Sequence, residues 1–415
     1  MYGSKKDIKH NLTLFFVDGI TFTPSLTLIS VAAIVPYFLT RLDATTFQIA
    51  LAASLALVCN FTAQPFFGSL ASRSRQMNKT FGKVLLLQRS IFMIFVISMP
   101  VFSANNTLLI WMFLFFWGLF HIFVGSYGVF FTPLLLKLLP PDKRGTVRGI
   151  GFAIGSFLGL GSAALIPVVL RNISFPYNFT LIFSLGIFFL LVNAILFMYM
   201  RQPKEITPNI SMSVRQYFKG MPATIIENAP FRAMIFTTMF LVVANSLLPF
   251  YTLYALRVFS ATESHIAAFA ALAVLSVAFA HVVFGAVVDR QGPKITLLIA
   301  TLLVISAGVL ALTTNSLSFL FLVWVLANLG NTCYLLTASL IIGEVSPSTK
   351  LPLYVGVQNI ISLALSSLVL LLLAPLIENI GFVLLFAAVL ACGLLSLLIN
   401  MFVLRKAMSN QATAA

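Results

Sequence analysis

Three ionisable side chains lie inside long apolar stretches of the sequence, where they could take part in coupling to protons. They are Asp18, Arg89 and His121. A carboxylate buried in a bilayer is energetically expensive unless it is paired or protonated, so Asp18 is a candidate proton carrier. An imidazole changes its charge close to physiological pH, which makes His121 a second candidate.

Each of these residues also has a structural interpretation. Asp18 and Arg89 lie at similar depth in their stretches and could form an ion pair, and a pair that protonation breaks would unite both interpretations. His121 could be a neutral side chain that is hydrogen-bonded within its bundle. For Arg89 alone we expect a structural role, because a long basic side chain can reach polar surroundings from an apolar helix.

A second chemical pattern is the short charged loop of residues 285–294, which reads GAVVDRQGPK. Asp289 can cap the following helix and neutralise Arg290. The dipeptide Gly292-Pro293 is expected to end one helix and begin the next. We interpret this loop as a tight cytoplasmic turn between two membrane spans.

A weaker copy of the loop occurs earlier in the chain and begins at Gly68, with Ser72 in place of the carboxylate. Arg144-Gly145 and Glu344 mark the cytoplasmic ends of other spans, where they could belong to the same gate. The predicted gate residues are Gly68, Ser72, Arg73, Arg144, Gly145, Gly285, Asp289, Arg290, Gly292, Lys294 and Glu344.

Uncharged polar residues also occur within the apolar stretches. Each alone is expected to hydrogen-bond between helices, which contributes about 0.6 kcal/mol on average. Together they are candidates to line a substrate cavity. They are Thr21, Asn60, Gln64, Tyr127, Asn245, Tyr251, Tyr254, Asn328, Asn331, Gln358 and Asn359.

Membrane-spanning helices are needed to position these residues. Of the 415 residues, 60% are hydrophobic and only 8% are charged, which excludes an ordinary soluble domain. The apolar stretches approach the ~20 residues that cross a bilayer as a helix and are too long and uniform for barrel strands. We place about twelve spans, at residues 12–39, 46–71, 81–101, 107–136, 146–170, 176–200, 231–256, 264–288, 294–313, 317–343, 351–376 and 380–404.

The distribution of basic residues predicts the orientation of these spans. The formal net charge is +15, and with a cytoplasmic N-terminus 21 of the 25 Lys and Arg residues lie on the inner side and three on the outer side. This is the positive-inside rule, so the basic charge fixes topology and does not indicate a nucleic-acid partner. We expect a multi-pass protein of the cell membrane with both termini in the cytoplasm.

The sequence also contains signs of an internal duplication. Pro140 and Pro347 are 207 residues apart, as are Gly149 and Gly356. Such constant offsets favour a six-plus-six arrangement of spans. We expect an N-terminal bundle at 1–200, a cytoplasmic linker with a short amphipathic helix at 201–230, and a C-terminal bundle at 231–415.

One glycine pattern predicts close helix packing. Gly151, Gly155 and Gly159 recur at four-residue spacing within the fifth span. Small residues at this spacing let two membrane helices approach closely.

The charged loop at 285–294 and its weaker copy resemble the signature loop of the major facilitator superfamily of secondary transporters, and the resemblance covers roughly residues 10–405. It implies an all-α membrane protein with two six-helix pseudo-repeat bundles around a central cavity. Many proton-linked members carry an arginine where this sequence has His121, so the sequence departs from the family pattern there.

The resemblance implies secondary active transport of a small organic solute by alternating access, and Asp18 favours coupling to protons. The alternatives are a uniporter or a lipid or amphiphile transporter without proton coupling, and a non-transporting receptor or scaffold of the same fold. An enzyme is not expected, because the sequence contains no H-E-x-x-H or G-x-S-x-G motif. We expect no cofactor, no metal and no nucleic-acid partner, and a monomer in the lipid bilayer.

Overall fold

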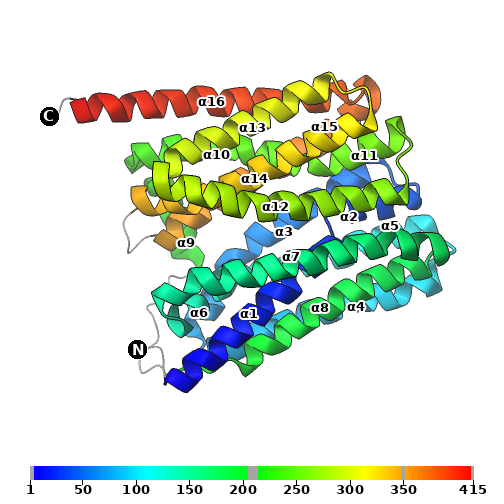
Figure 1. The fold of residues 1–415 in the computed structure, drawn as a ribbon, viewed down its shortest axis with the longest axis horizontal. Coiled ribbons are helices and arrows are strands. Elements are labelled where there is room, and N and C mark those ends of the chain that lie inside the picture. The colour runs from blue at the N-terminus through cyan, green and yellow to red at the C-terminus, as the bar shows by residue number, and fades with distance from the viewer. Residues whose placement is uncertain (1–3, 204–213, 347–350, 413–415) are drawn as a thin grey trace. The chain divides into compact units, whose positions relative to one another are not determined.

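The computed structural model describes residues 4–203, 214–346 and 351–412, which form helices joined by short connections (Figure 1). No strand occurs among these residues. The chain divides into two compact units, one of Met1–Val214 with Thr262–Val274 and one of Arg215–Ala261 with Leu275–Ala415.

The first unit contains eight complete helices and the first part of α12. The eight are α1 (Lys5–Leu28), α2 (Ile34–Arg41), α3 (Thr46–Arg73), α4 (Met77–Phe102), α5 (Asn106–Val124), α6 (Ser126–Leu138), α7 (Pro141–Asn172) and α8 (Tyr177–Tyr199). The second unit contains the rest of α12 (Glu263–Gln291) and the remaining helices. These are α9 (Val214–Glu227), α10 (Ala229–Ser246), α11 (Leu248–Val258), α13 (Pro293–Leu312), α14 (Leu317–Val345), α15 (Leu351–Ile380) and α16 (Val383–Ala412).

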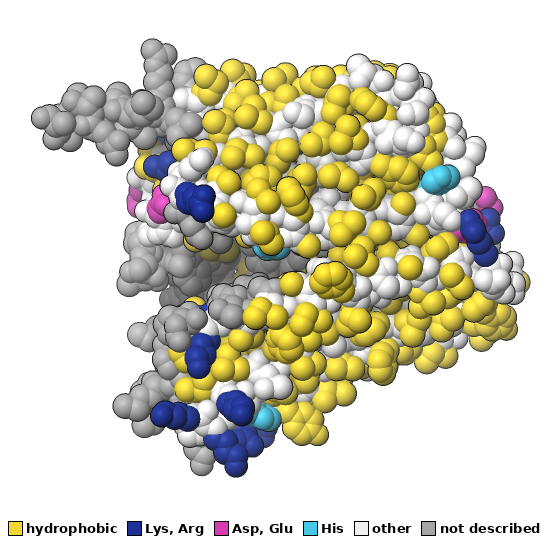
Figure 2. Space-filling view, viewed as in Figure 1, with side chains coloured by type: hydrophobic (Ala, Val, Ile, Leu, Met, Phe, Trp, Pro, Cys, Tyr) yellow, Lys and Arg dark blue, Asp and Glu magenta, His cyan; other side chains and the backbone are white. Residues whose placement is uncertain are grey.

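Eleven helical segments of the described chain are long and apolar enough to cross a membrane, and the all-α multi-pass fold is thereby confirmed. Hydrophobic side chains cover the lengths of the helices in each unit, whereas many Lys and Arg side chains lie near the helix ends (Figure 2). About twelve such spans were predicted. The exception is α1, which has the length of a span at 24 residues but is more polar than the others.

Several predicted spans differ in detail from the helices observed. The first predicted span, 12–39, is divided into α1 and α2, and the fourth and seventh are divided into α5 with α6 and α10 with α11. The break between α12 and α13 was predicted correctly, because Gly292 adopts φ +84° and α13 begins at Pro293. The predicted linker helix corresponds to α9.

Helix α1 packs against α8 in antiparallel register. Its buried residues Asn11, Phe15 and Asp18 follow the spacing of one helix face. Asn11 contacts Arg201 just beyond α8, Phe15 contacts Phe197, and Asp18 contacts a residue one turn further back in α8. This register determines which part of α8 faces the carboxylate.

The opposite side of α1 packs against α7 through the predicted glycine stripe. A Cβ atom built on Gly155 would lie 2.5 Å from the carbonyl oxygen of Gly19, and one built on Gly151 would lie 2.9 Å from the carbonyl oxygen of Phe16. Backbone atoms cannot move aside as side chains can. The close packing predicted from the glycine spacing is therefore confirmed.

We expect Gly155→Ala to destabilise the protein by about 1–3 kcal/mol, because the added methyl group overpacks the contact between α1 and α7. Gly161→Ala is the matched control on the same helix, since its Cβ meets nothing within 4 Å. That substitution should be neutral or stabilise by roughly 0.5–1 kcal/mol. Thermal unfolding of the purified variants tests this, and equal stability of the two would contradict the packing described.

Candidate functional site

The carboxylate of Asp18 lies in the interior of the first unit, with only 4% of the residue exposed. Asn193 of α8 donates its side-chain N–H to Asp18 Oδ1. The hydroxyl of Tyr127, from α6, lies 3.5 Å from the same oxygen and also donates to it. Donors on two other helices thus stabilise the negative charge of a side chain that water does not reach freely.

Arg89 lies nearby on α4 and is 2% exposed. Its guanidinium donates to the backbone carbonyls of Leu85 and Leu190, each at 3.2 Å, and to the side-chain oxygen of Gln88. It also donates to Asn193 Oδ1 at 3.3 Å. The buried cation is therefore held by acceptors from α4 and α8.

The side-chain amide of Asn193 bridges the two charged groups. Its oxygen faces the guanidinium of Arg89 and its nitrogen faces the carboxylate of Asp18. This orientation is the one that both charges favour, because the oxygen accepts and the nitrogen donates. The structure therefore brings Asp18 and Arg89 into one hydrogen-bonded network, as their similar depth predicted, but through a third residue.

An aromatic layer lies one helical turn from this network, toward the N-terminal end of α1. The ring of Phe15 makes edge contacts with Phe131 at 5.8 Å and Phe197 at 6.2 Å. The ring of Tyr127 stacks on Phe131 at 5.3 Å. These rings surround Asp18 with apolar surface on that side and strengthen the electrostatic interactions within the network.

Among the described residues, His121 makes no hydrogen bond to this network. It is 8% exposed, and its ring packs edge-on against Trp117 at 4.4 Å and against Phe120 at 5.4 Å. Within the described part of the chain, neither ring nitrogen has a hydrogen-bond partner. Its proposed proton-carrying role is separate from that of Asp18 in this conformation.

The cavity candidates of the first unit are half-buried or form local contacts. Gln64 donates to Asn60 at 3.3 Å, so these two polar residues of α3 lie together. The hydroxyl of Thr21 donates to the carbonyls of Val17 and Asp18 on its own helix. Apart from Tyr127, none of these contacts connects the candidates with the carboxylate of Asp18.

In the second unit, the structure forms a neutral polar cluster around Gln358 of α15, which is 2% exposed. Its amide nitrogen donates to Thr238 of α10 at 3.1 Å and to Tyr334 of α14 at 3.3 Å. Asn328 donates to a carbonyl of its own helix. Asn245, Asn331 and Asn359 are half-buried.

Two predicted cavity tyrosines lie in an aromatic cluster of the second unit. The rings of Tyr251 and Tyr254 lie 5.4 and 5.0 Å from that of Phe386 in α16. Tyr251 is only 1% exposed. In this conformation, therefore, Tyr251 has little surface to offer a solute.

The structure describes the side chains of some predicted gate residues but not of others. Arg144 donates to the carbonyls of Leu136 and Leu139 at 2.7 and 2.9 Å, so it caps the end of α6. Cβ atoms built on Gly68 and Gly285 would meet nothing within 4 Å, so neither glycine lies in a close helix contact among the described residues. Exposed side chains belong to Arg73, Arg290, Lys294 and Glu344. The surroundings of Ser72, Gly145 and Asp289 lie outside the described residues.

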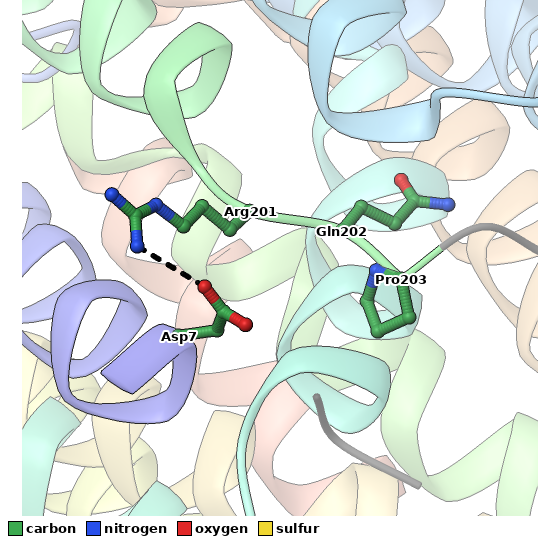
Figure 3. Close-up of a pocket in the computed structure, with 4 residues that line it drawn as sticks. All are labelled: Asp7, Arg201, Gln202 and Pro203. Atoms are coloured by element: carbon green, nitrogen blue, oxygen red, sulfur yellow. Dashed lines mark hydrogen bonds and ion pairs between the residues drawn. The ribbon is translucent and has the colours of Figure 1, made fainter. Parts of the chain in front are cut away.

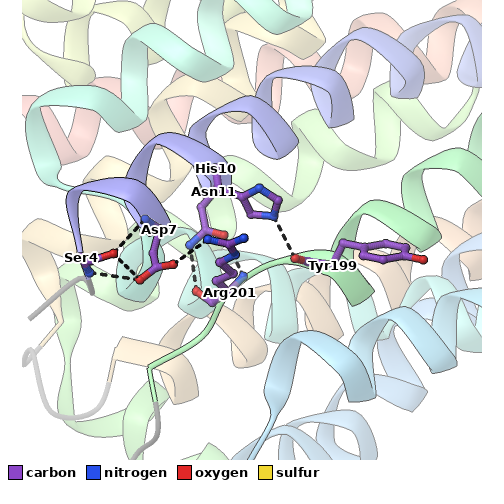
Figure 4. Close-up of polar contacts among 6 residues, drawn as sticks. All are labelled: Ser4, Asp7, His10, Asn11, Tyr199 and Arg201. Atoms are coloured by element: carbon purple, nitrogen blue, oxygen red, sulfur yellow. Dashed lines mark hydrogen bonds and ion pairs between the residues drawn. The ribbon is translucent and has the colours of Figure 1, made fainter.

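A second polar site joins the start of α1 to the segment that follows α8 (Figure 4). The side-chain amide of Asn11 makes two hydrogen bonds to the backbone of Arg201, both at 2.9 Å. His10 contacts the carbonyl oxygen of Tyr199 at 3.1 Å, and Asp7 forms an ion pair with Arg201 at 3.1 Å. These contacts fix the beginning of the linker on α1.

The ion-paired side chains of Asp7 and Arg201 also line a small surface cavity of ≈ 230 Å³, together with Gln202 and Pro203 (Figure 3). The hydrogen bond from the Ser4 hydroxyl, together with Arg201, lowers the pKa of the Asp7 carboxyl. Asp7 is therefore ionised at neutral pH. Its charge is paired directly with Arg201, whereas the buried Asp18 is joined to Arg89 through Asn193.

Sequence reasoning missed the residues that complete both polar clusters. Asn193 and Gln88 belong to the first, and Thr238 and Tyr334 to the second. Gln88 is important because it also donates to the carbonyl of Phe120 at 2.9 Å and so extends the first cluster to α5. The available signal was a polar amide within an apolar span, as at Asn193.

Neither a family model nor a curated protein matches this sequence. Solved structures match over nearly its full length. A bacterial homologue of the human lysosomal transporter Spinster, in an inward-facing and unoccupied conformation, is 16% identical over 97% of this chain and 96% of its own, with a TM-score of 0.62. The human organic anion transporter MFSD10 (TETRAN) is 14% identical over 95% of this chain and 99% of its own, with a TM-score of 0.67. At such identities the similarity concerns the fold alone.

The network predicts a specific coupling between Arg89 and Asp18. We expect Arg89→Met to destabilise the protein by about 3 kcal/mol, because it leaves the buried carboxylate without its compensating cation. Adding Asp18→Asn should recover part of this loss, since the uncompensated charge is then removed. Unfolding of wild type, both single variants and the double variant measures the coupling. Strictly additive effects would show that the two charges do not interact.

Proposed function

We propose that this chain, whose fold is that of the major facilitator superfamily, is a secondary transporter that moves a small organic solute by alternating access and couples the movement to protons. The observation that carries the proposal is the burial of Asp18 within a multi-span helical protein, in a network that also holds Arg89. A buried carboxylate is the kind of group whose charge a protein can switch by protonation.

In the proposed mechanism, protonation of Asp18 removes one of the two charges that Asn193 bridges. The carboxyl group then attracts the amide N–H of Asn193 and the hydroxyl of Tyr127 less strongly. Since these residues belong to α8 and α6, the change alters how α1 is held by its neighbours. A protonation event at one side chain can thereby favour one conformation of the helices over another.

The orientation and assembly belong to the same proposal. Both termini lie in the cytoplasm, the bundles are 1–200 and 231–415 with a linker at 201–230, and the protein acts as a monomer in the cell membrane. The basic residues, 21 of which lie on the side assigned to the cytoplasm, support this orientation. The polar candidates listed in the sequence, among them the buried Gln358, are proposed to contact the solute in other conformations of the cycle.

One observation favours a second candidate, an uncoupled uniporter or amphiphile transporter. The N–H groups of Arg89 also donate to several acceptors other than Asn193. The network can therefore also be understood as a purely structural contact between helices. Proton coupling distinguishes the two candidates, because only a coupled transporter accumulates its solute in response to a pH gradient.

We expect Asp18→Asn to abolish accumulation driven by a pH gradient while downhill exchange of the solute continues. Asp7→Asn is the matched control, because Asp7 is an acidic residue of the same helix but lies at its exposed end. A screen of organic anions, cations and neutral solutes by thermal shift would select the solute for flux measurements in proteoliposomes. Unchanged proton-driven accumulation in Asp18→Asn would remove Asp18 from the mechanism.

The two copies of the signature loop should contribute unequally to the gate. We expect Asp289→Asn to reduce the transport rate more than Ser72→Ala, because only Asp289 carries a charge that can neutralise a neighbouring arginine. Initial rates of solute flux in proteoliposomes, at matched protein content, measure the difference. Equal tolerance of both substitutions contradicts an asymmetric gate.

A further inference from the structure

The side chain of Asn193 hydrogen-bonds to both Asp18 and Arg89. It is completely buried and lies in the C-terminal third of α8. Both ends of its amide are engaged with a charged group, so a change of charge at either end acts on the same planar group. No sequence motif assigns a function to this residue.

Comparison of the two repeats shows that this arrangement is specific to the first. Asn400 of α16 is 207 residues after Asn193, the offset that also relates Pro140 to Pro347 and Gly149 to Gly356. It too is buried, at 4% exposed. Within the described residues, however, its amide nitrogen has no hydrogen-bond partner. The position is retained as a buried asparagine, but the partners differ.

The reason for the difference lies in the neighbouring helices. Helix α10 packs against α16, as α1 packs against α8. The sequence of α10 contains no Asp or Glu, whereas α1 contains Asp18 in its apolar part. A buried asparagine near a carboxylate and a guanidinium can act on both, whereas Asn400 has no carboxylate from α10 to bind.

We propose that Asn193 is a positioning residue of the proton-coupled cycle, which transmits the protonation state of Asp18 to Arg89 and so to the packing of α1 and α4 on α8. This inference rests on the proposed function, because it assigns to Asn193 the step between protonation and helix movement. An asparagine bonded to Arg89 alone would stabilise the bundle equally at every pH, because the guanidinium keeps its charge. A transmitting asparagine makes the stability of the bundle depend on the charge of Asp18.

The groups that face Asp18 support this assignment. Arg89 approaches from α4 and is the neighbouring charge, and Tyr127 approaches from α6. Helix α7 meets this part of α1 through Gly151, which brings no titratable side chain. Asn193 is thus the direct hydrogen-bonded connection between the carboxylate and the positive charge.

The test measures thermal unfolding of the full-length protein in detergent between pH 5 and pH 8, without any solute. At each pH, the Tm of Asp18→Asn is subtracted from the Tm of wild type. The change of this difference across the pH range is the part of the pH dependence that Asp18 causes. We expect Asn193→Leu, which keeps the branched shape of the side chain but has no amide, to reduce this difference to less than half. Asn400→Leu, the repeat-related control, should retain it. If Asn193→Leu does not fold, Asn193→Ser provides the same comparison with a small polar side chain.

A Tm that Asn193→Leu lowers equally at all pH values, with the Asp18-dependent part intact, would overturn the inference. The inference would also be overturned if the Tm of the wild type showed no Asp18-dependent part in this range. The outcome is independent of the proposed function, because no transport is measured. Loss of the Asp18-dependent part in Asn193→Leu together with proton-independent flux would support the link between the residues and reject proton coupling.

Discussion

The first unit depends on one constraint, which is that a charge inside a bilayer must be solvated by the protein itself. The carboxylate of Asp18 and the guanidinium of Arg89 are both almost completely buried. Hydrogen bonds of this network involve α1, α4, α6 and α8, and Gln88 extends it to α5. Because an unsatisfied charge in this environment would be very costly, these helices must keep their relative positions as long as both groups are ionised.

The same constraint explains the character of α1. An aspartate side chain is short, so its carboxylate reaches Asn193 only if α1 lies close to α8. On the opposite side, the glycines of α7 let the backbone of α1 approach to within contact distance. A helix enclosed in this way does not need an apolar surface for lipid. Polar residues can therefore be buried along α1, and they make this helix less apolar than the other spans.

The sequence allowed the spans, the break at Gly292-Pro293 and the glycine stripe to be predicted, because each of these depends on local composition or spacing. The similar depth of Asp18 and Arg89 also followed from counting residues along their helices. The intervening Asn193 did not, because its contact depends on the rotation of α8 about its own axis. The faces of a uniformly apolar helix look alike in sequence. The packing of His121 against Trp117 was also not predictable, because α5 is uniformly apolar too.

The two units bury different kinds of polar group. The first unit buries opposite charges, and the second buries neutral groups around Gln358, Thr238 and Tyr334. Neutral hydrogen bonds cost less to bury and do not change between pH 5 and pH 8, whereas the charge of a buried carboxylate can. Of these two clusters, only the ionic network contains a group whose hydrogen bonds protonation would weaken. A response to protons that originates in these buried clusters must therefore begin in the first unit.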